Sequence, residues 1–305
     1  MSENFRLEQI ILFFLLAIGI TWLCWIPTLI ISNMRNYFVP SVLTFNLIFE
    51  EGFQDSFHLI IFILNQAGIY GPFLAAILTL KVFNRKDDLK TLFKECINWK
   101  INPKWYVFIL LIPLFINFGS LGLAALLMAE MSLTFNPGMG LSLILLMFLN
   151  NLITSGLEEP GWRGFAVPEL VKRYPAYKSS IIVGLVWAIW HYPYVFYLNY
   201  FELNLGVFLT ILAMLGFTVL TTFGSVIYSW LYLNTKSIFL LIIFHTLQNI
   251  LPILILGGVI DPLGGFSTAI FTLIIIAVIS KRYGEETLQG LTEKEFEEKE
   301  KKTAQ

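Results

Sequence analysis

The side chains in this sequence that could do chemistry are two adjacent carboxylates and two histidines, all within otherwise apolar segments. The carboxylates, Glu158 and Glu159, stand in the run SGLEEPGWRG, which also contains Arg163. His191 ends the run WAIWH, and His245 begins the run HTLQN. An ionisable residue at the centre of a membrane-inserted helix costs about 2.5–3.5 kcal/mol on insertion scales, so such residues usually serve a function. These residues are therefore the first candidates for an active site.

The spacing around the acidic pair predicts different roles for the two carboxylates. Adjacent residues on a helix point about 100° apart, so Glu158 and Glu159 do not share one role. Arg163 follows Glu159 by four residues, which is the spacing of a helical ion pair. We expect Arg163 to neutralise and orient Glu159, which leaves Glu158 facing a cavity. The alternative is that these charges mark a helix end at the cytoplasmic boundary, where water begins.

The histidines come from separate segments. His245 and Asn249 are four residues apart and share one helical face, whereas His191 belongs to another helix. A single buried histidine is more often a packing residue than a catalyst, but two histidines with a carboxylate pair favour a site. The third histidine, His58, lies at the outer end of an apolar segment, where contact with water would explain it.

Two kinds of water activation are consistent with these residue types. A carboxylate beside a histidine can deprotonate water, and a second histidine with an amide on its face can stabilise an oxyanion. These roles describe a peptidase that uses water directly, without a covalent serine or cysteine nucleophile. The alternative is zinc or another divalent metal on Glu158, His191 and His245, because a His₂Glu set is a catalytic zinc pattern. The HExxH signature of common zinc proteases is absent from the sequence. Asn249 favours the route without a cofactor, because an amide is a good oxyanion donor and a poor zinc ligand.

The elements that must position these residues are predicted to be membrane-spanning helices. The chain has 305 residues, of which 57% are hydrophobic and 13% charged, whereas soluble domains have about 25% charged residues. A helix that crosses a bilayer needs about 20 mostly apolar residues. Such segments occur at residues 8–32, 57–83, 105–130, 141–157, 179–199, 206–231, 237–257 and 267–280. We therefore predict an all-α, polytopic membrane protein with eight transmembrane helices.

Composition also excludes several classes of protein. The low charge excludes a soluble enzyme and a disordered chain, and the net charge of −1 argues against a nucleic-acid binder. Cys24 and Cys96 suggest neither a disulfide framework nor a cysteine metal site. The adjacent Asn150 and Asn151 are interpreted as helix-packing residues. Without internal repeats, the chain is predicted to form one membrane domain over residues 1–284, followed by a charged, solvated cytoplasmic tail over 285–305.

The distribution of basic residues predicts the topology. Lys and Arg are frequent in segments 84–104 and 158–178, and Lys236 and the residues from Lys281 onward continue this alternation. The intervening connections contain Arg35 as their basic residue and the acids Glu50, Glu51, Asp55, Glu130, Glu202 and Asp261. Since Lys and Arg accumulate in cytoplasmic loops, both termini are predicted to be cytoplasmic.

The same topology places the candidate residues relative to the membrane. At 1.5 Å per residue, His191 and His245 lie ~18 Å and ~12 Å along their helices from the cytoplasmic side. We therefore expect a cavity that opens to the cytoplasm. A short amphipathic helix, on the membrane surface or packed on helix ends, is predicted from the spacing of Leu89, Leu92, Phe93, Cys96 and Ile97.

Taken together, three motifs resemble one known family. The acid pair with Arg163, the aromatic residue four positions before His191, and His245 with Asn249 are similar to the motifs of the type II CAAX prenyl proteases. That family belongs with the bacterial CPBP, or ABI, intramembrane proteases. The resemblance covers residues 141–257. The family usually has Phe where this chain has Trp187, which keeps a large aromatic wall but alters the shape of the pocket.

The resemblance implies an eight-helix intramembrane endopeptidase with assigned roles. It implies that Glu158 and His191 act on the attacking water and that His245 and Asn249 stabilise the oxyanion. Supporting roles fall to Glu159, Arg163 and Trp187.

The resemblance also implies a class of substrate. The expected substrate is a protein or peptide, prenylated or not at a C-terminal CAAX sequence, that is cleaved near its C-terminus within the lipid bilayer. The alternatives are a bacteriocin-processing protease and a non-catalytic immunity or scaffold protein with the same fold. Every motif residue is present, which favours an enzyme.

Overall fold

The protein is built from helices that are long enough to cross a membrane. A computed structural model describes residues 5–39, 47–48, 51–127, 140–256, 262–290 and 295. Within these ranges every regular element is a helix. Six helices are long and apolar enough to span a membrane, and counting each of two bent helix pairs as one span gives eight. The predicted all-α architecture is confirmed, and the predicted eight spans agree with the count that includes the bent pairs.

The spans formed by one unbroken helix lie within a few residues of the predicted segments. They are α1 (Leu7–Arg35), α6 (Lys104–Leu127), α12 (Gly206–Thr235), α13 (Ile238–Leu256) and α14 (Pro262–Tyr283). Residues 128–130 and 257 of the predicted spans lie outside the described residues, as do Glu50, Glu130 and Asp261. The eighth span, predicted as a short segment, is part of a helix of 22 residues.

Two predicted spans are bent rather than straight. The second consists of α3 (Ser56–Ile69) and α4 (Gly71–Val82), which meet at 53°. The fifth consists of α10 (Ala176–Trp190), α11 (Tyr192–Tyr197) and the π-helix η3 (Leu198–Glu202), with a bend of 50°. A proline stands in the first turn after each break, Pro72 in α4 and Pro193 in α11. Proline lacks an N–H and clashes with the preceding turn, so each apolar segment breaks there.

The fourth span extends further than the sequence predicted. It begins with α7 (Leu141–Ile153) and continues through η1 (Ser155–Glu158), α8 (Glu159–Gly161), the π-helix η2 (Trp162–Ala166) and α9 (Val167–Val171). The prediction of a loop from residue 158 was wrong, because Pro160 and Pro168 fall in first turns that helices tolerate. Arg163, which was counted among the loop charges, lies in η2 and is fully buried.

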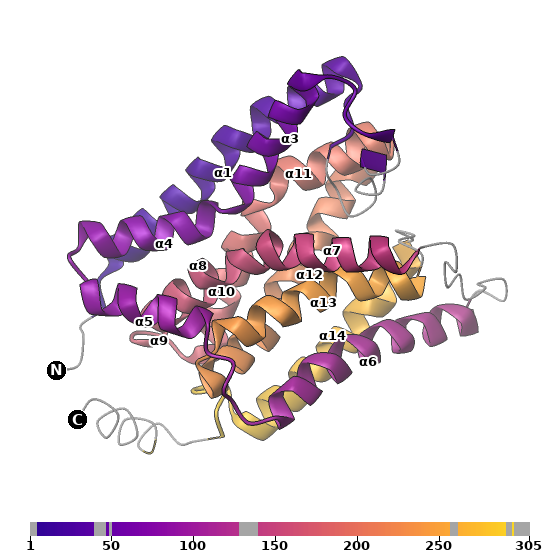
Figure 1. The fold of residues 1–305 in the computed structure, drawn as a ribbon. Coiled ribbons are helices and arrows are strands. Elements are labelled where there is room, and N and C mark those ends of the chain that lie inside the picture. The colour runs from indigo at the N-terminus through magenta and orange to yellow at the C-terminus, as the bar shows by residue number, and fades with distance from the viewer. Residues whose placement is uncertain are drawn as a thin grey trace.

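The helices form layers on either side of the segment that carries the acid pair. In Figure 1, α1, α3 and α4 lie together along one side, α6, α13 and α14 along the other, and α8 and α10 between them. Close backbone contacts become possible where glycine removes a side chain, as at Gly184, where a Cβ would meet the backbone of α12. Indole N–H groups tie α1 to α10, because Trp22 donates to the carbonyl of Trp190 and Trp190 donates to Thr21 Oγ1.

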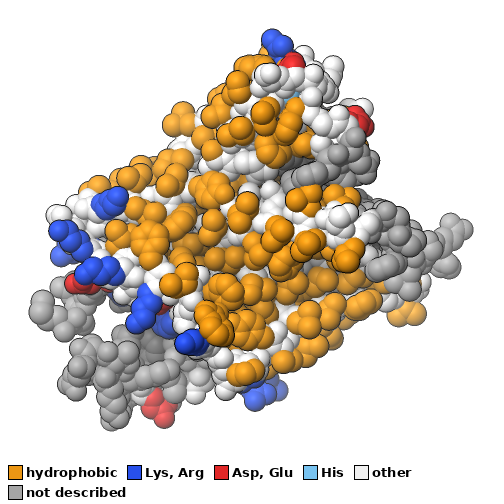
Figure 2. All heavy atoms as spheres, viewed as in Figure 1, with side chains coloured by type: hydrophobic (Ala, Val, Ile, Leu, Met, Phe, Trp, Pro, Cys, Tyr) orange, Lys and Arg blue, Asp and Glu red, His pale blue; other side chains and the backbone are white. Residues whose placement is uncertain are grey.

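The predicted amphipathic helix is confirmed as α5 (Lys86–Cys96). Leu92 is buried against the bundle, whereas Phe93 and Ile97 are exposed. In the view of Figure 2, apolar side chains cover most of the visible face, and a group of Lys and Arg side chains lies at the end where α5 is found. The helix therefore packs on the ends of the spans with one face and keeps apolar side chains exposed on another.

The first residues of the predicted solvated tail are instead packed against the helices. The backbone N–H groups of Ala176 and Tyr177, in the first turn of α10, donate to the carbonyls of Glu286 and Glu285, and Leu288 is buried. The first residues of the predicted solvated tail thus cap a helix, whose initial N–H groups need acceptors. Residues 291–294 and 296–305 lie outside the described part of the chain.

His58 is fully buried as well, contrary to the expectation that it contacts water. Its Nδ1 accepts from the N–H of Gln54, and its Nε2 donates to the carbonyl of Phe38. The ring stacks on Tyr37 with 4.5 Å between centroids. The connection before α3 covers this ring, which its position in the sequence did not indicate.

Candidate functional site

Glu159 joins two helices through its carboxylate. Oε1 and Oε2 accept from Arg163 Nη1 at 3.2 and 3.1 Å, so the predicted ion pair between residues four apart is confirmed. Oε1 also accepts from Nδ1 of His245, on α13, at 2.8 Å. Both members of the ion pair are 0% exposed. A buried charge pair is costly to break, so these bonds hold α8 and α13 in a fixed relation.

Arg163 is enclosed by aromatic rings. Its guanidinium carbon lies 4.3 Å from the ring centroid of Trp187 and 4.4 Å from that of Tyr228. Its Nη2 donates to Ser225 Oγ at 3.1 Å. Cation–π contacts and hydrogen bonds compensate for the loss of water around a buried charge. Tyr228 and Ser225 come from α12, and sequence spacing gave no signal for either.

Glu158 is held differently from Glu159. Its Oε2 accepts a hydrogen bond from the indole Nε1 of Trp187 at 2.8 Å, and its side chain does not pair with Arg163. Only 3% of the residue is exposed. The alternative of a solvated charge cluster at a helix end is therefore wrong. As the sequence predicted, Arg163 pairs with Glu159 and leaves Glu158 available.

His191 lies at the bend between α10 and α11, and the bend orients its ring. Its backbone N–H bonds to the carbonyl of Ala188, so the carbonyl of Trp187 is released from the regular helical pattern. That carbonyl instead accepts from Nδ1 of the His191 ring at 2.8 Å. Because a carbonyl only accepts, Nδ1 carries the hydrogen, and Nε2 of the neutral ring has a lone pair. The residue is half-buried.

Asn249 contacts a residue that the sequence analysis missed as part of the site. Its Nδ2 donates to Oδ1 of Asn151, on α7, at 3.0 Å. Asn151 had been interpreted as a packing residue. The available signal was its position seven residues before Glu158, about two helical turns away along the same span.

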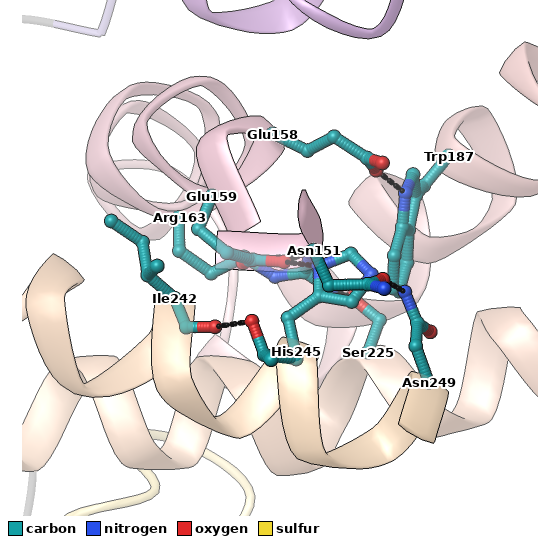
Figure 3. Close-up of polar contacts among 10 residues, drawn as sticks. Asn151, Glu158, Glu159, Arg163, Trp187, Ser225, Ile242, His245 and Asn249 are labelled. Carbon is teal, nitrogen blue, oxygen red and sulfur yellow. Dashed lines mark hydrogen bonds and ion pairs between the residues drawn. The ribbon is translucent and has the colours of Figure 1, made fainter. Parts of the chain in front are cut away.

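The candidate residues converge around Trp187 from three directions. Its indole holds Glu158, its carbonyl holds His191, and its ring centroid lies 5.7 Å from that of His191 and 5.5 Å from that of His245. Figure 3 shows Glu158 and Trp187 joined above the group formed by Glu159, Arg163 and His245, with Asn151 and Asn249 beside it. Six of the seven predicted site residues are thus joined by direct contacts, and Asn249 lies beside them, one turn beyond His245 on α13.

The alternative metal set is not assembled in this arrangement. Throughout the described ranges, no three His, Cys, Asp or Glu side chains are grouped so that they could hold a metal ion. Glu158, His191 and His245 therefore do not form a ligand set in this structure.

Comparison with known proteins identifies the family. A sequence model described as type II CAAX prenyl endopeptidase Rce1-like matches residues 140–251, a range that contains every residue of the cluster. A protein of Methanococcus maripaludis named CAAX prenyl protease 2 is 32% identical in an alignment of 244 positions that covers 72% of this chain and 83% of that protein. This chain belongs to the type II CAAX prenyl endopeptidase family. The resemblance found in the sequence is thereby confirmed.

Membership in the type II CAAX prenyl endopeptidase family explains the location of the site. These proteins are intramembrane proteases, and the chain accordingly has apolar helices of membrane-spanning length around a buried polar cluster. The protein is therefore a multi-pass membrane protein of a hydrolase family.

Proposed function

We propose that this protein is a CAAX-type intramembrane endopeptidase in which Glu158 is the general base. The proposal rests on the different surroundings of two adjacent carboxylates. Glu159 is occupied by Arg163 and His245, whereas Glu158 is buried without an ion-pair partner and held by one indole N–H. A positioned carboxylate in hydrogen-bonding reach of water is what general-base catalysis requires.

The proposed reaction is direct attack by water on a peptide carbonyl. Glu158 accepts a proton as the water oxygen bonds to the carbonyl carbon, and the lone pair on His191 Nε2 orients that water. Asn249 and His245 donate hydrogen bonds to the oxyanion. The C–N bond then breaks, and the proton held by Glu158 passes to the departing nitrogen, giving a carboxylic acid and an amine. Transfer of the acid's proton to the amine then yields the carboxylate and the ammonium group.

The donor role proposed for His245 specifies its charge. Nδ1 already donates to Glu159, so an N–H at Nε2 is present only in the imidazolium form. Glu159 is then the counter-ion of both His245 and Arg163. With Glu158 ionised, the two carboxylates and the two cations of this buried cluster balance in charge, which favours the arrangement in an apolar environment.

We further propose that no metal takes part. The amide of Asn249 suits an oxyanion better than zinc, and the three alternative ligands are not grouped. Purified active protein should contain no stoichiometric zinc, and cleavage should persist after treatment with a strong chelator. One tightly held zinc per active chain, lost together with activity and restored with it, would contradict this prediction.

The proposed substrate is a protein or peptide that is cleaved near its C-terminus from the cytoplasmic side. The names of the family and of the relative point to prenylated CAAX sequences. The test is cleavage by detergent-purified protein of two peptides with the same CAAX sequence, one farnesylated and one not, with Glu158→Ala protein as the control.

The two peptides distinguish the possible functions. We expect the wild-type protein to release the last three residues from the farnesylated peptide only. The Glu158→Ala protein should cleave neither peptide. Equal cleavage of both peptides would support a protease without prenyl recognition, such as one that processes bacteriocins. Binding without cleavage of either peptide would contradict the proposal and indicate a scaffold.

A further inference from the structure

A chain of hydrogen bonds leads from the backbone of α7 to the site on α13. Nδ2 of Asn151 donates to the carbonyl of Met147 at 2.9 Å, and Oδ1 of Asn151 accepts from Nδ2 of Asn249 at 3.0 Å. Asn151 is 7% exposed, and Met147 packs with Ile250 and Ile253 in an apolar cluster. An apolar enclosure strengthens such bonds and makes their loss costly.

The carbonyl of Met147 determines the direction of these hydrogen bonds. The carbonyl of Met147 can only accept, so the amide nitrogen of Asn151 must face it and the amide oxygen must face α13. That oxygen in turn selects the nitrogen of Asn249. In Figure 3 the amide nitrogen of Asn249 points to Asn151 and its oxygen points away. One hydrogen of Nδ2 is therefore used, and the other remains available for a substrate.

The two elements that carry these amides are also packed together on the side of the contact towards Glu159. Gly156 of η1 lies so close to Ile242 of α13 that an added Cβ would approach the Ile242 side chain to 2.7 Å. Glu159 bonds to His245 one turn further along. Asn151 and Asn249 make the third contact between these antiparallel segments. The position of the Asn249 amide is thus set by packing as well as by its own hydrogen bond.

We propose that Asn151 is a positioning residue that presents the Nδ2 hydrogen, rather than the oxygen, of Asn249 to the reacting carbonyl. This inference rests on the proposed oxyanion role of Asn249. Without Asn151 the amide of Asn249 can rotate, and an oxygen facing the oxyanion would repel it. A purely structural Asn151 would affect stability instead of turnover.

The test is a double-mutant cycle in the full-length protein, with the farnesylated CAAX peptide as the probe. The variants are Asn151→Leu, Asn249→Ala and the double variant, with Asn151→Ala as a second choice if the leucine variant does not fold. Asn150→Leu is the matched control, because its side chain lies outside this chain of hydrogen bonds. Turnover, KM and the detergent unfolding temperature are measured for each variant.

Positioning predicts a specific pattern of effects. Asn151→Leu should lower kcat about 10-fold with unchanged KM, while Asn249→Ala lowers it about 10²–10³-fold. The double variant should be no slower than Asn249→Ala alone, because Asn151 acts through Asn249. Asn150→Leu should behave as wild type.

Two results would overturn the inference. One is a wild-type kcat in folded Asn151→Leu protein, and the other is a defect that multiplies with that of Asn249→Ala. Failure of the proposed function would be recognised by other results. Either Asn249→Ala would keep full turnover, or both the wild-type and the Asn150→Leu proteins would be inactive. Either of these results would also contradict the positioning role of Asn151.

Discussion

At the scale of single residues, Glu159 and Glu158 are chemically identical neighbours with different surroundings. Glu159→Gln removes the negative charge that Arg163 and His245 share, and it leaves the guanidinium buried without a counter-ion. Breaking a buried pair in this way costs about 3–5 kcal/mol. We expect a matching fall in the free energy of unfolding, measured by denaturant titration in detergent.

The matched variant for this measurement is Glu158→Gln. Its side chain has no ion pair in the structure, and a glutamine can still accept from Trp187. We therefore expect it to retain most of the wild-type stability. Equal stability of both variants would contradict the supporting role assigned to Glu159.

At the scale of elements, the spans could be predicted from sequence and their bends could not. A run of about 20 apolar residues usually forms a membrane-spanning helix. The consequence of a proline in such a run depends on which neighbours replace the lost hydrogen bond. At His191 the replacement is the histidine ring itself, bonded to the carbonyl that the bend releases. Sequence spacing could not reveal this relation.

The same limit explains which site residues were found. Relations between residues four apart on one helix, such as Glu159 with Arg163, were predictable because helical geometry fixes them. Asn151 was missed because its partner, Asn249, is 98 positions away on another helix. Ser225 and Tyr228 enclose Arg163 from α12 in the same way, and only the packed structure brings them to it.

The bend at His191 has a testable consequence. Pro193→Ala restores an N–H and lets the helix straighten, so the backbone of His191 can compete for the carbonyl of Trp187. We expect kcat to fall about 10-fold through misplacement of the ring. The detergent unfolding temperature should not fall, since a mid-span proline usually weakens a helix.

A suitable control is Pro113→Ala, in α6, which removes a helix-interior proline that takes no part in this cluster. Unchanged turnover in the folded Pro193→Ala variant would contradict a role for the bend.

At the scale of the whole molecule, both described ends of the chain lie at one end of the bundle. Phe5 packs on Tyr174 with 6.0 Å between ring centroids, and Glu286 bonds to the neighbouring Ala176. An even number of spans requires this arrangement. The Lys and Arg side chains around α5 gather at one end of the molecule as well, which under the positive-inside rule predicts that this end is cytoplasmic.

Site-directed labelling tests that orientation. In Cys24→Ala protein, a cysteine at Lys90 should react with a membrane-impermeant thiol reagent only from the cytoplasm, and one at Glu51 only from outside. Burial, together with the charge of Glu95, raises the pKa of the native Cys96 thiol to about 12, so its background reaction is slow. Labelling of both positions from the same side would contradict the eight-span topology.

The rate of peptide cleavage by Glu158→Gln protein in reconstituted vesicles tests the central claim most directly. Glutamine keeps the volume and the hydrogen bond from Trp187 but cannot accept the proton of water. We predict a fall in kcat of about 10²–10⁴-fold, the usual size of a general-base contribution, in a protein that keeps most of its wild-type stability and its affinity for the peptide. Wild-type turnover by folded Glu158→Gln protein would contradict the account.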